Sequence, residues 1–110
     1  MRYEEPRSIS REDALVDLTH ADPAVVAETL VRLALHDPGY SFVEQKCLDL
    51  LAHGEPNVRR VAAICLGHLA RLHRRTTEAT LTALRSLQDD PAVGGSATDA
   101  LSDIAMFATE

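Results

Sequence analysis

The side chains of this sequence that could do metal or nucleophilic chemistry are five histidines and two cysteines. A zinc site needs three or four His, Cys or carboxylate ligands that the fold brings to one point. His68 and His73 are five residues apart on one predicted helix and do not share a face, and no carboxylate lies four residues from His68. His53 belongs to a different predicted helix. The spacing therefore predicts no metal site, and no cofactor is expected.

Cys65 and His68 are three residues apart on the same predicted helix, as a nucleophile and its base would be. Cys65, however, falls among the apolar residues of that helix, where a free cysteine packs as a small hydrophobic residue. Cys47 has the same setting, and the two are not spaced as a CxxC site or a disulfide framework. The sequence also lacks a Gly-rich phosphate loop and a G-x-S-x-G motif. We therefore expect two reduced core cysteines and a protein that is not an enzyme.

A basic segment is the remaining concentration of chemistry. Residues 55–75, EPNVRRVAAICLGHLARLHRR, contain five arginines and two histidines, and no acidic residue follows Glu55. The whole chain of 110 residues has 17 acidic residues against 11 Lys and Arg, a formal net charge of -6. An acidic balance disfavours nucleic-acid binding and favours a basic partner. The basic segment therefore has to be explained by its place in the fold.

Three copies of an acid-Pro-x-Val motif show how the chain is organised. They occupy residues 22–25, 55–58 and 90–93, and their prolines are 33 and 35 residues apart. Proline is tolerated in the first turn of a helix, and a preceding acidic side chain can accept hydrogen bonds from the free N–H groups there. Each motif is therefore predicted to open the second helix of a helix pair.

Apolar residues recur 2, 6, 10 and 13 residues after the prolines, a period near 3.6. In the middle unit they are Val58, Ala62, Leu66 and Leu69. The pattern predicts helices near residues 10–20, 24–36, 41–53, 57–74, 77–88 and 92–107, after an N-terminal extension at 1–9. Ser10 and Thr77 are the predicted N-caps of two of them. Since no pair can bury its stripe alone, the prediction is one all-α domain, residues 1–110, a right-handed α-solenoid of about three helix pairs.

The second helix of the middle unit resembles that of a HEAT repeat. The shared run, acid-Pro-x-Val-Arg-x-x-Ala-x-x-x-Leu-Gly-x-Leu, is carried here by Glu55, Pro56, Val58, Arg59, Ala62, Leu66, Gly67 and Leu69. The first unit departs from it with Val26 and Thr29. The third has two glycines, each costing roughly 1 kcal/mol inside a helix, which favours a late helix start near Ser96. A tetratricopeptide array has a similar period but usually needs aromatic residues that this chain mostly lacks.

In a HEAT-like stack the second helices line the concave wall. If the apolar stripe faces the core, the other side of the middle helix carries Arg60, Ile64, His68, Arg71 and Arg75. The corresponding positions are Ala27, Val31 and Leu35 in the first pair, and Asp99, Asp103 and Met106 in the third. The wall is then apolar, basic and acidic across its three helices, as a recognition face for a protein partner would be. The alternative is a solvated face on which the arginines pair with the aspartates.

The predicted turn at 36–42 is a second candidate contact region. It holds Tyr40 and Phe42, half of the aromatic residues of the chain. Because aromatic residues are enriched at interaction hot spots, we expect Tyr40 to contact a partner, whereas Phe42 packs at the start of its helix. An alternative for the apolar positions of the first pair is that Tyr3 and Ile9 cover them.

The segment from residue 37 to residue 75 resembles small bacterial HEAT-like immunity proteins of toxin systems, including contact-dependent inhibition. The resemblance implies a non-enzymatic protein that binds and neutralises a toxin domain, and an acidic chain suits a basic nuclease toxin. Without a visible signal peptide or membrane span, it is expected in the cytoplasm. Two alternatives remain open. One is a HEAT-type scaffold or assembly subunit, similar to units of phycobilin lyases; the other is phosphate or RNA binding by Arg59, Arg60, Arg71, Arg74 and Arg75.

Overall fold

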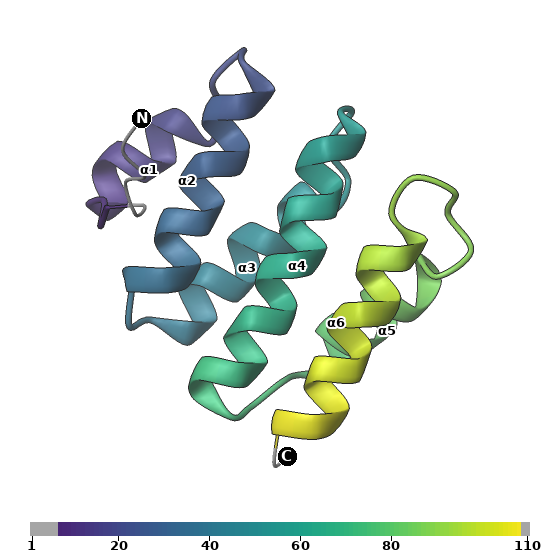
Figure 1. Cartoon of the computed structure of the whole chain (residues 1–110). Helices are drawn as coiled ribbons and strands as arrows, with labels where there is room; N and C mark the ends of the chain where they lie inside the picture. Colours follow the sequence, from purple (N-terminus) through teal and green to yellow (C-terminus); the bar gives the residue numbers. More distant parts are fainter. Residues whose placement is uncertain (1–6, 109–110) are drawn as a thin grey trace, which may run out of the picture.

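The computed structural model describes residues 7–108, which form six helices (Figure 1). These are α1 (Arg11–Asp17), α2 (Pro23–His36), α3 (Tyr40–Leu50), α4 (Pro56–His73), α5 (Glu78–Ser86) and α6 (Gly94–Phe107). This part of the chain contains no strand, so the all-α prediction is confirmed. Each helix begins within two residues of its predicted start. None of these helices has the length and apolar character needed to cross a membrane.

Capping chemistry fixes most of the helix starts. Ser10 and Thr77 are N-caps, as predicted, and each hydroxyl oxygen accepts a backbone N–H three residues further on. Asp22 caps α2 by accepting the N–H of Ala24 at 2.9 Å. The prolines that open α2 and α4 lack an N–H that would otherwise have no partner. Glu55 stands in the same place before α4 but makes no side-chain cap hydrogen bond.

The third acid-Pro motif departs from the first two. Asp90 Oδ1 accepts hydrogen bonds from the N–H groups of Ala92 (2.7 Å) and Val93 (3.1 Å), so a turn precedes the helix. Helix α6 therefore begins at Gly94, two residues later than predicted and before the late start that the glycines suggested. A Cβ at Gly94 would collide with the carbonyl oxygen of Gln88. A glycine here allows that close approach.

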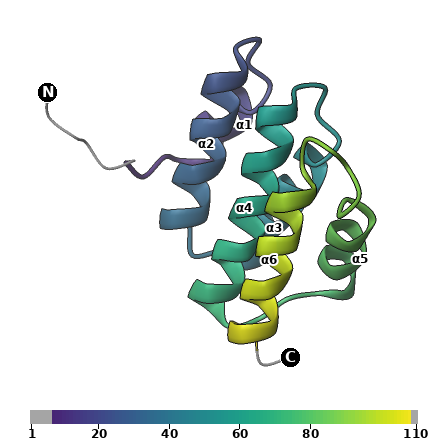
Figure 2. The ribbon, with the colours of Figure 1, turned by 45° about the vertical axis from the view of Figure 1, so that its right-hand side comes forward.

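Helices α2, α4 and α6 lie side by side and run in the same direction, and α1, α3 and α5 form a second layer behind them (Figures 1 and 2). Helix α4 is central, because it packs against α2, α3 and α6. Its stripe residues Val58, Ala62, Leu66 and Leu69 are at most 2% exposed, which confirms the predicted core side. The opposite side of α4 faces outward between α2 and α6.

The predicted N-terminal extension lies partly outside the described residues, and so does Tyr3. Residues 7–9 run along α2, because Arg32 donates hydrogen bonds to the carbonyl oxygens of Arg7 (2.9 Å) and Ser8 (3.0 Å). Ile9 packs against the core. The N-terminal segment thus packs on the first helix pair, and Leu35 keeps 40% of its surface exposed.

Candidate protein-interaction face

Helix α4 places four of the predicted residues on its outward side. Ile64 is 47% exposed, Arg71 is exposed, and Arg60 and His68 are half-buried. Successive members are separated by about one helical turn of 5.4 Å, so they form a stripe along the helix. Arg60 donates a hydrogen bond to the carbonyl oxygen of Ala92 at 3.3 Å and is thereby tied to the turn before α6.

Arg75 does not share that side. Helix α4 ends at His73, and Arg74 has a φ of 58°, in the left-handed region. The chain turns there, and the Arg75 guanidinium lies 4.3 Å from the ring centroid of Tyr40 on α3. The prediction failed for Arg75 because it continued the helical spacing beyond the end of the helix.

The C-terminal ends of α2, α4 and α6 meet around a shallow depression of about 370 Å³. Its lining residues are Leu35, His68, Arg71, Leu72 and Phe107, and we call it the three-helix depression. The guanidinium carbons of Arg71 and Arg74 lie 5.4 and 5.7 Å from the Phe107 ring centroid, within the range of cation–π attraction. Sequence analysis missed Leu72 and Phe107. Leu72 follows His68 by four residues, a spacing that could have indicated it.

Asp99 is exposed and Asp103 half-buried on α6. A Cβ at Gly67 would lie 3.1 Å from Asp103 Oδ2 and 3.2 Å from the Cα of Ala100, so the glycine lets α6 close against α4. Asp103 therefore borders α4, as expected. Within residues 7–108, however, no ion pair joins either aspartate to the three arginines predicted for this face. The described residues thus show no pairing of those arginines with the aspartates, and the solvated face itself stays an alternative.

Tyr40 is not presented to a partner, contrary to expectation. It is the first residue of α3, and it is only 6% exposed because its ring packs into the core. Its hydroxyl donates to the Glu44 carboxylate at 2.9 Å, and the Tyr40 and His73 rings meet in a T-shaped arrangement with centroids 5.5 Å apart. Burial, followed by the interaction with Glu44, raises the pKa of the Tyr40 phenol well above its ordinary value. The aromatic turn is thus a structural element.

Glu44 gathers three hydroxyl groups between α3 and α5. Besides the Tyr40 hydroxyl, its Oε2 accepts hydrogen bonds from Thr77 Oγ1 at 2.7 Å and Thr80 Oγ1 at 2.6 Å. The residue is 8% exposed. This cluster gives a buried carboxylate the hydrogen bonds it needs and joins the two helices. Nothing in the spacing of these residues pointed to it.

The turn before α3 is clamped to α1. Arg11 donates two hydrogen bonds of 2.9 Å to the Asp37 carboxylate, whose Oδ1 also accepts the Gly39 N–H at 2.8 Å. These bonds, with the Arg11 contribution first, hold the pKa of Asp37 below its ordinary value. The Arg11 guanidinium also lies 4.3 Å from the Phe42 ring centroid. A Cβ at Gly39 would collide with the Arg11 guanidinium as it lies here, so a larger residue would require that flexible side chain to shift.

The two cysteines and His68, which were considered for chemistry, lie in different environments. Cys47 and Cys65 are fully buried free thiols in the core. Hydrogen bonding to Cys65, then burial, raises the pKa of the Cys47 thiol well above its ordinary value. His68 lies at the surface, in the three-helix depression. Across residues 7–108, no group of three or more His, Cys, Asp or Glu side chains is placed to hold a metal ion.

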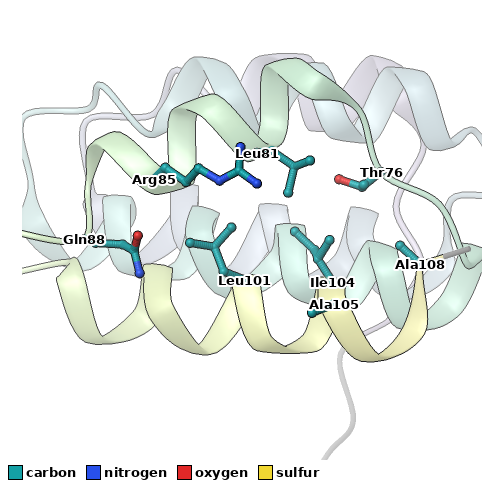
Figure 3. Close-up of a pocket in the computed structure, with 8 residues that line it drawn as sticks. All are labelled: Thr76, Leu81, Arg85, Gln88, Leu101, Ile104, Ala105 and Ala108. Carbon is teal, nitrogen blue, oxygen red and sulfur yellow. The ribbon is translucent and has the colours of Figure 1, made fainter. Parts of the chain in front are cut away.

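A second groove runs between α5 and α6 at the end of the stack (Figure 3). Leu81, Leu101 and Ile104 supply much of its apolar lining, and its volume is about 480 Å³. Arg85 lies beside this lining and is exposed. The sequence did not predict this groove. Like the three-helix depression, this groove places an arginine next to apolar side chains, but on another side of the molecule.

No protein-family model and no curated protein matches the chain. Among solved structures, the chain is similar to one in the crystal structure of a CDI complex from Cupriavidus taiwanensis LMG 19424, with a TM-score of 0.80. The chain resembles a component of a CDI complex. The identity is 28%, and the match covers 97% of each chain, so the likeness extends over essentially the whole helical stack.

Proposed function

We propose that this protein is the immunity protein of a contact-dependent inhibition system, which binds and neutralises a cognate toxin domain. The observation that carries the proposal is the likeness to a chain of a CDI complex at 28% identity over 97% of both chains. In this proposal the protein acts by covering the toxin in the cytoplasm, without catalysis and without a cofactor. Its helix pairs are a right-handed HEAT-like stack, and its second helices supply the binding wall.

The surface supports a protein as the partner. Three separate helices contribute to the three-helix depression, and Leu35 and Leu72 within it are 40% and 55% exposed. Contiguous apolar surface rimmed by polar groups marks interaction sites. The net charge of -6 would also speed the encounter with a basic toxin domain, such as a nuclease, through long-range attraction.

The arrangement of the arginines argues against a phosphate or RNA track along α4. Arg59 donates to the carbonyl oxygens of His53 (2.8 Å) and Gly54 (3.2 Å), and Arg60 donates to a carbonyl before α6. Arg71 lies eleven residues beyond Arg60, roughly 16 Å along the helix. The five arginines therefore form two separate groups, whereas a single-stranded backbone needs a continuous basic groove.

A co-expression experiment tests the proposal. The toxin domain encoded directly upstream of this gene is expressed from an inducible promoter in a bacterial host, with and without this protein. The expected result is growth arrest by the toxin domain alone, rescue on co-expression, and a stable 1:1 complex by size-exclusion chromatography. Neither rescue nor a complex at micromolar concentrations would refute the proposal. Growth arrest by this chain alone would also refute it, because the chain would then be the toxic component.

A further inference from the structure

Exposed apolar side chains concentrate around the three-helix depression. Among the described residues, six large apolar side chains are exposed, and four of them belong to the second helices: Leu35, Ile64, Leu72 and Met106, which are 40, 47, 55 and 74% exposed. Leu35 and Leu72 line the depression. Ile64 precedes His68 by one turn, and Met106 adjoins Phe107. Leu35, Leu72 and Phe107 give the depression itself an apolar lining, and Phe and Arg are enriched in protein interfaces.

The charge at this surface is positive, although the protein is acidic as a whole. The ionisable residues that line the depression are His68 and Arg71, and Arg74 also approaches the Phe107 ring. Arg71 interacts with this ring through its cationic group, which leaves its N–H donors able to bind a carboxylate. Asp103, on the neighbouring helix, lies against Gly67, four residues before Arg71, and does not form an ion pair with it.

We infer that the three-helix depression binds an apolar side chain of the toxin domain, and that Arg71 binds a carboxylate beside that side chain. The partner's contact patch is therefore apolar and acidic, whatever the net charge of the partner. Net charge affects the rate of encounter. In the contact itself, charges more than about 8 Å away are largely screened at physiological salt, so the charges next to the depression govern binding there. The identity of the partner rests on the proposed function. The chemistry of the patch rests on the depression alone.

The first experiment probes the depression without any toxin. Isotopically labelled protein is titrated with a synthetic helical peptide that has Leu on one face and Glu on the other, and with a counterpart in which Lys replaces Glu. We expect chemical-shift changes centred on Leu35, His68, Leu72 and Phe107 with the Glu peptide only. Arg71→Glu should weaken this binding about tenfold or more, whereas Arg85→Glu, at the α5–α6 groove, should change it less than twofold. Thermal melting verifies that both variants fold, as expected for exposed positions.

The second experiment measures the affinity of the toxin domain for the wild type, Arg71→Glu, Leu72→Ala and Arg85→Glu by calorimetry. We expect the affinity to fall about tenfold or more for Arg71→Glu and Leu72→Ala, and less than twofold for Arg85→Glu. If the toxin domain binds all four proteins equally, the inference is wrong while the proposed function stands. If the Glu peptide binds the depression but the toxin domain does not bind, the depression chemistry stands and the proposed function fails.

Three other outcomes would overturn the inference directly. One is the absence of shift changes at the depression with the Glu peptide. Another is equal binding of the Lys peptide or of a single-stranded RNA oligonucleotide there, which would show that the surface does not select an acidic protein segment. The last is concentration-dependent self-association that Arg71→Glu abolishes, which would assign the depression to a second copy of the chain.

Discussion

Replacing Glu44 with alanine should destabilise the protein by about 3 kcal/mol. Glu44 is 8% exposed, and one of its carboxylate oxygens accepts hydrogen bonds from the hydroxyls of Tyr40, Thr77 and Thr80 at 2.9, 2.7 and 2.6 Å. Two of the donors precede or lie within α5, whereas Glu44 and Tyr40 lie on α3. The carboxylate therefore links two helices of the second layer.

The magnitude follows from the burial of the donors. Tyr40 and Thr80 are 6% and 2% exposed, so water cannot replace the missing carboxylate at either hydroxyl. An unsatisfied buried hydroxyl costs roughly 1–3 kcal/mol, which gives roughly 2–6 kcal/mol for the two. Thr77 is only half-buried and still caps α5 through the Thr80 N–H, so it adds little. Relief from burying a carboxylate offsets part of the loss, which leaves about 3 kcal/mol.

Urea and thermal unfolding of purified Glu44→Ala provide the assay. A loss of about 3 kcal/mol should lower the Tm by roughly 10–20 °C for a chain of this size. Glu28→Ala, at an exposed position on α2, is the matched control and should cost less than about 0.5 kcal/mol. Adding Tyr40→Phe to Glu44→Ala should cost less than Tyr40→Phe alone, because the hydroxyl it removes is already unpaired. A stability of Glu44→Ala within about 0.5 kcal/mol of the wild type would refute the reasoning.

The remaining predictions concern the core side, the turn clamp and the contact between α4 and α6. Leu66→Asp should unfold the protein in circular dichroism, because it places an unpaired charge at a position that is 2% exposed, whereas Arg71→Glu should leave the Tm nearly unchanged. The reverse pattern would mean that α4 faces the other way. Asp37→Asn should be less stable than the wild type at pH 7, and the difference should vanish at low pH. The reason is that Arg11 lowers the pKa of Asp37, so its stabilisation is present above the ordinary value of about 3.9 and is lost as the pH falls through the lower folded pKa. Parallel stability curves from pH 7 to pH 2 would contradict this. Gly67→Val should cost roughly 1–3 kcal/mol in thermal melts by overpacking against α6, and an unchanged Tm would show that α6 shifts freely.

Helix positions and the core side of α4 could be predicted because they depend on local chemistry. Proline in a first turn, Ser10 and Thr77 as caps, and a 3.6-residue apolar period each act over a few residues, and each was found as expected except at Pro91, which precedes its helix. The outward side of α4 followed from the same period, which placed Ile64 and Arg71 on it. The sequence therefore predicted the helix starts and these residues of the candidate face.

The remainder of the candidate site depends on contacts between distant segments. Arg75 left the predicted stripe because Arg74 takes a left-handed conformation, and its side chain packs on a ring from α3. Tyr40 is buried because a carboxylate one turn further along α3 accepts its hydroxyl. Phe107 enters the depression because α6 closes against α4 at Gly67. Apart from Tyr40 and Glu44, which are one turn apart, such pairings join residues about 30 or more positions apart, where a single sequence gives no spacing to measure.

The arginines at the end of α4 can be understood from the direction of the helices. The first two repeats begin their second helix directly after an acidic residue and proline, and Asp90 lies in the turn before α6, so acidic residues stand at the positive ends of the helix dipoles. The last turn of α4 carries Arg71, and a cation is favoured at this negative end by roughly 0.3–1 kcal/mol. Helices α2, α4 and α6 run in parallel (Figure 1), so the acidic residues that precede them lie at one end of the stack, and Arg71 and Arg74 lie at the other. A stabilising charge pattern within each helix thus produces a basic, apolar surface on an acidic protein, and this surface is where a partner's carboxylate would be bound.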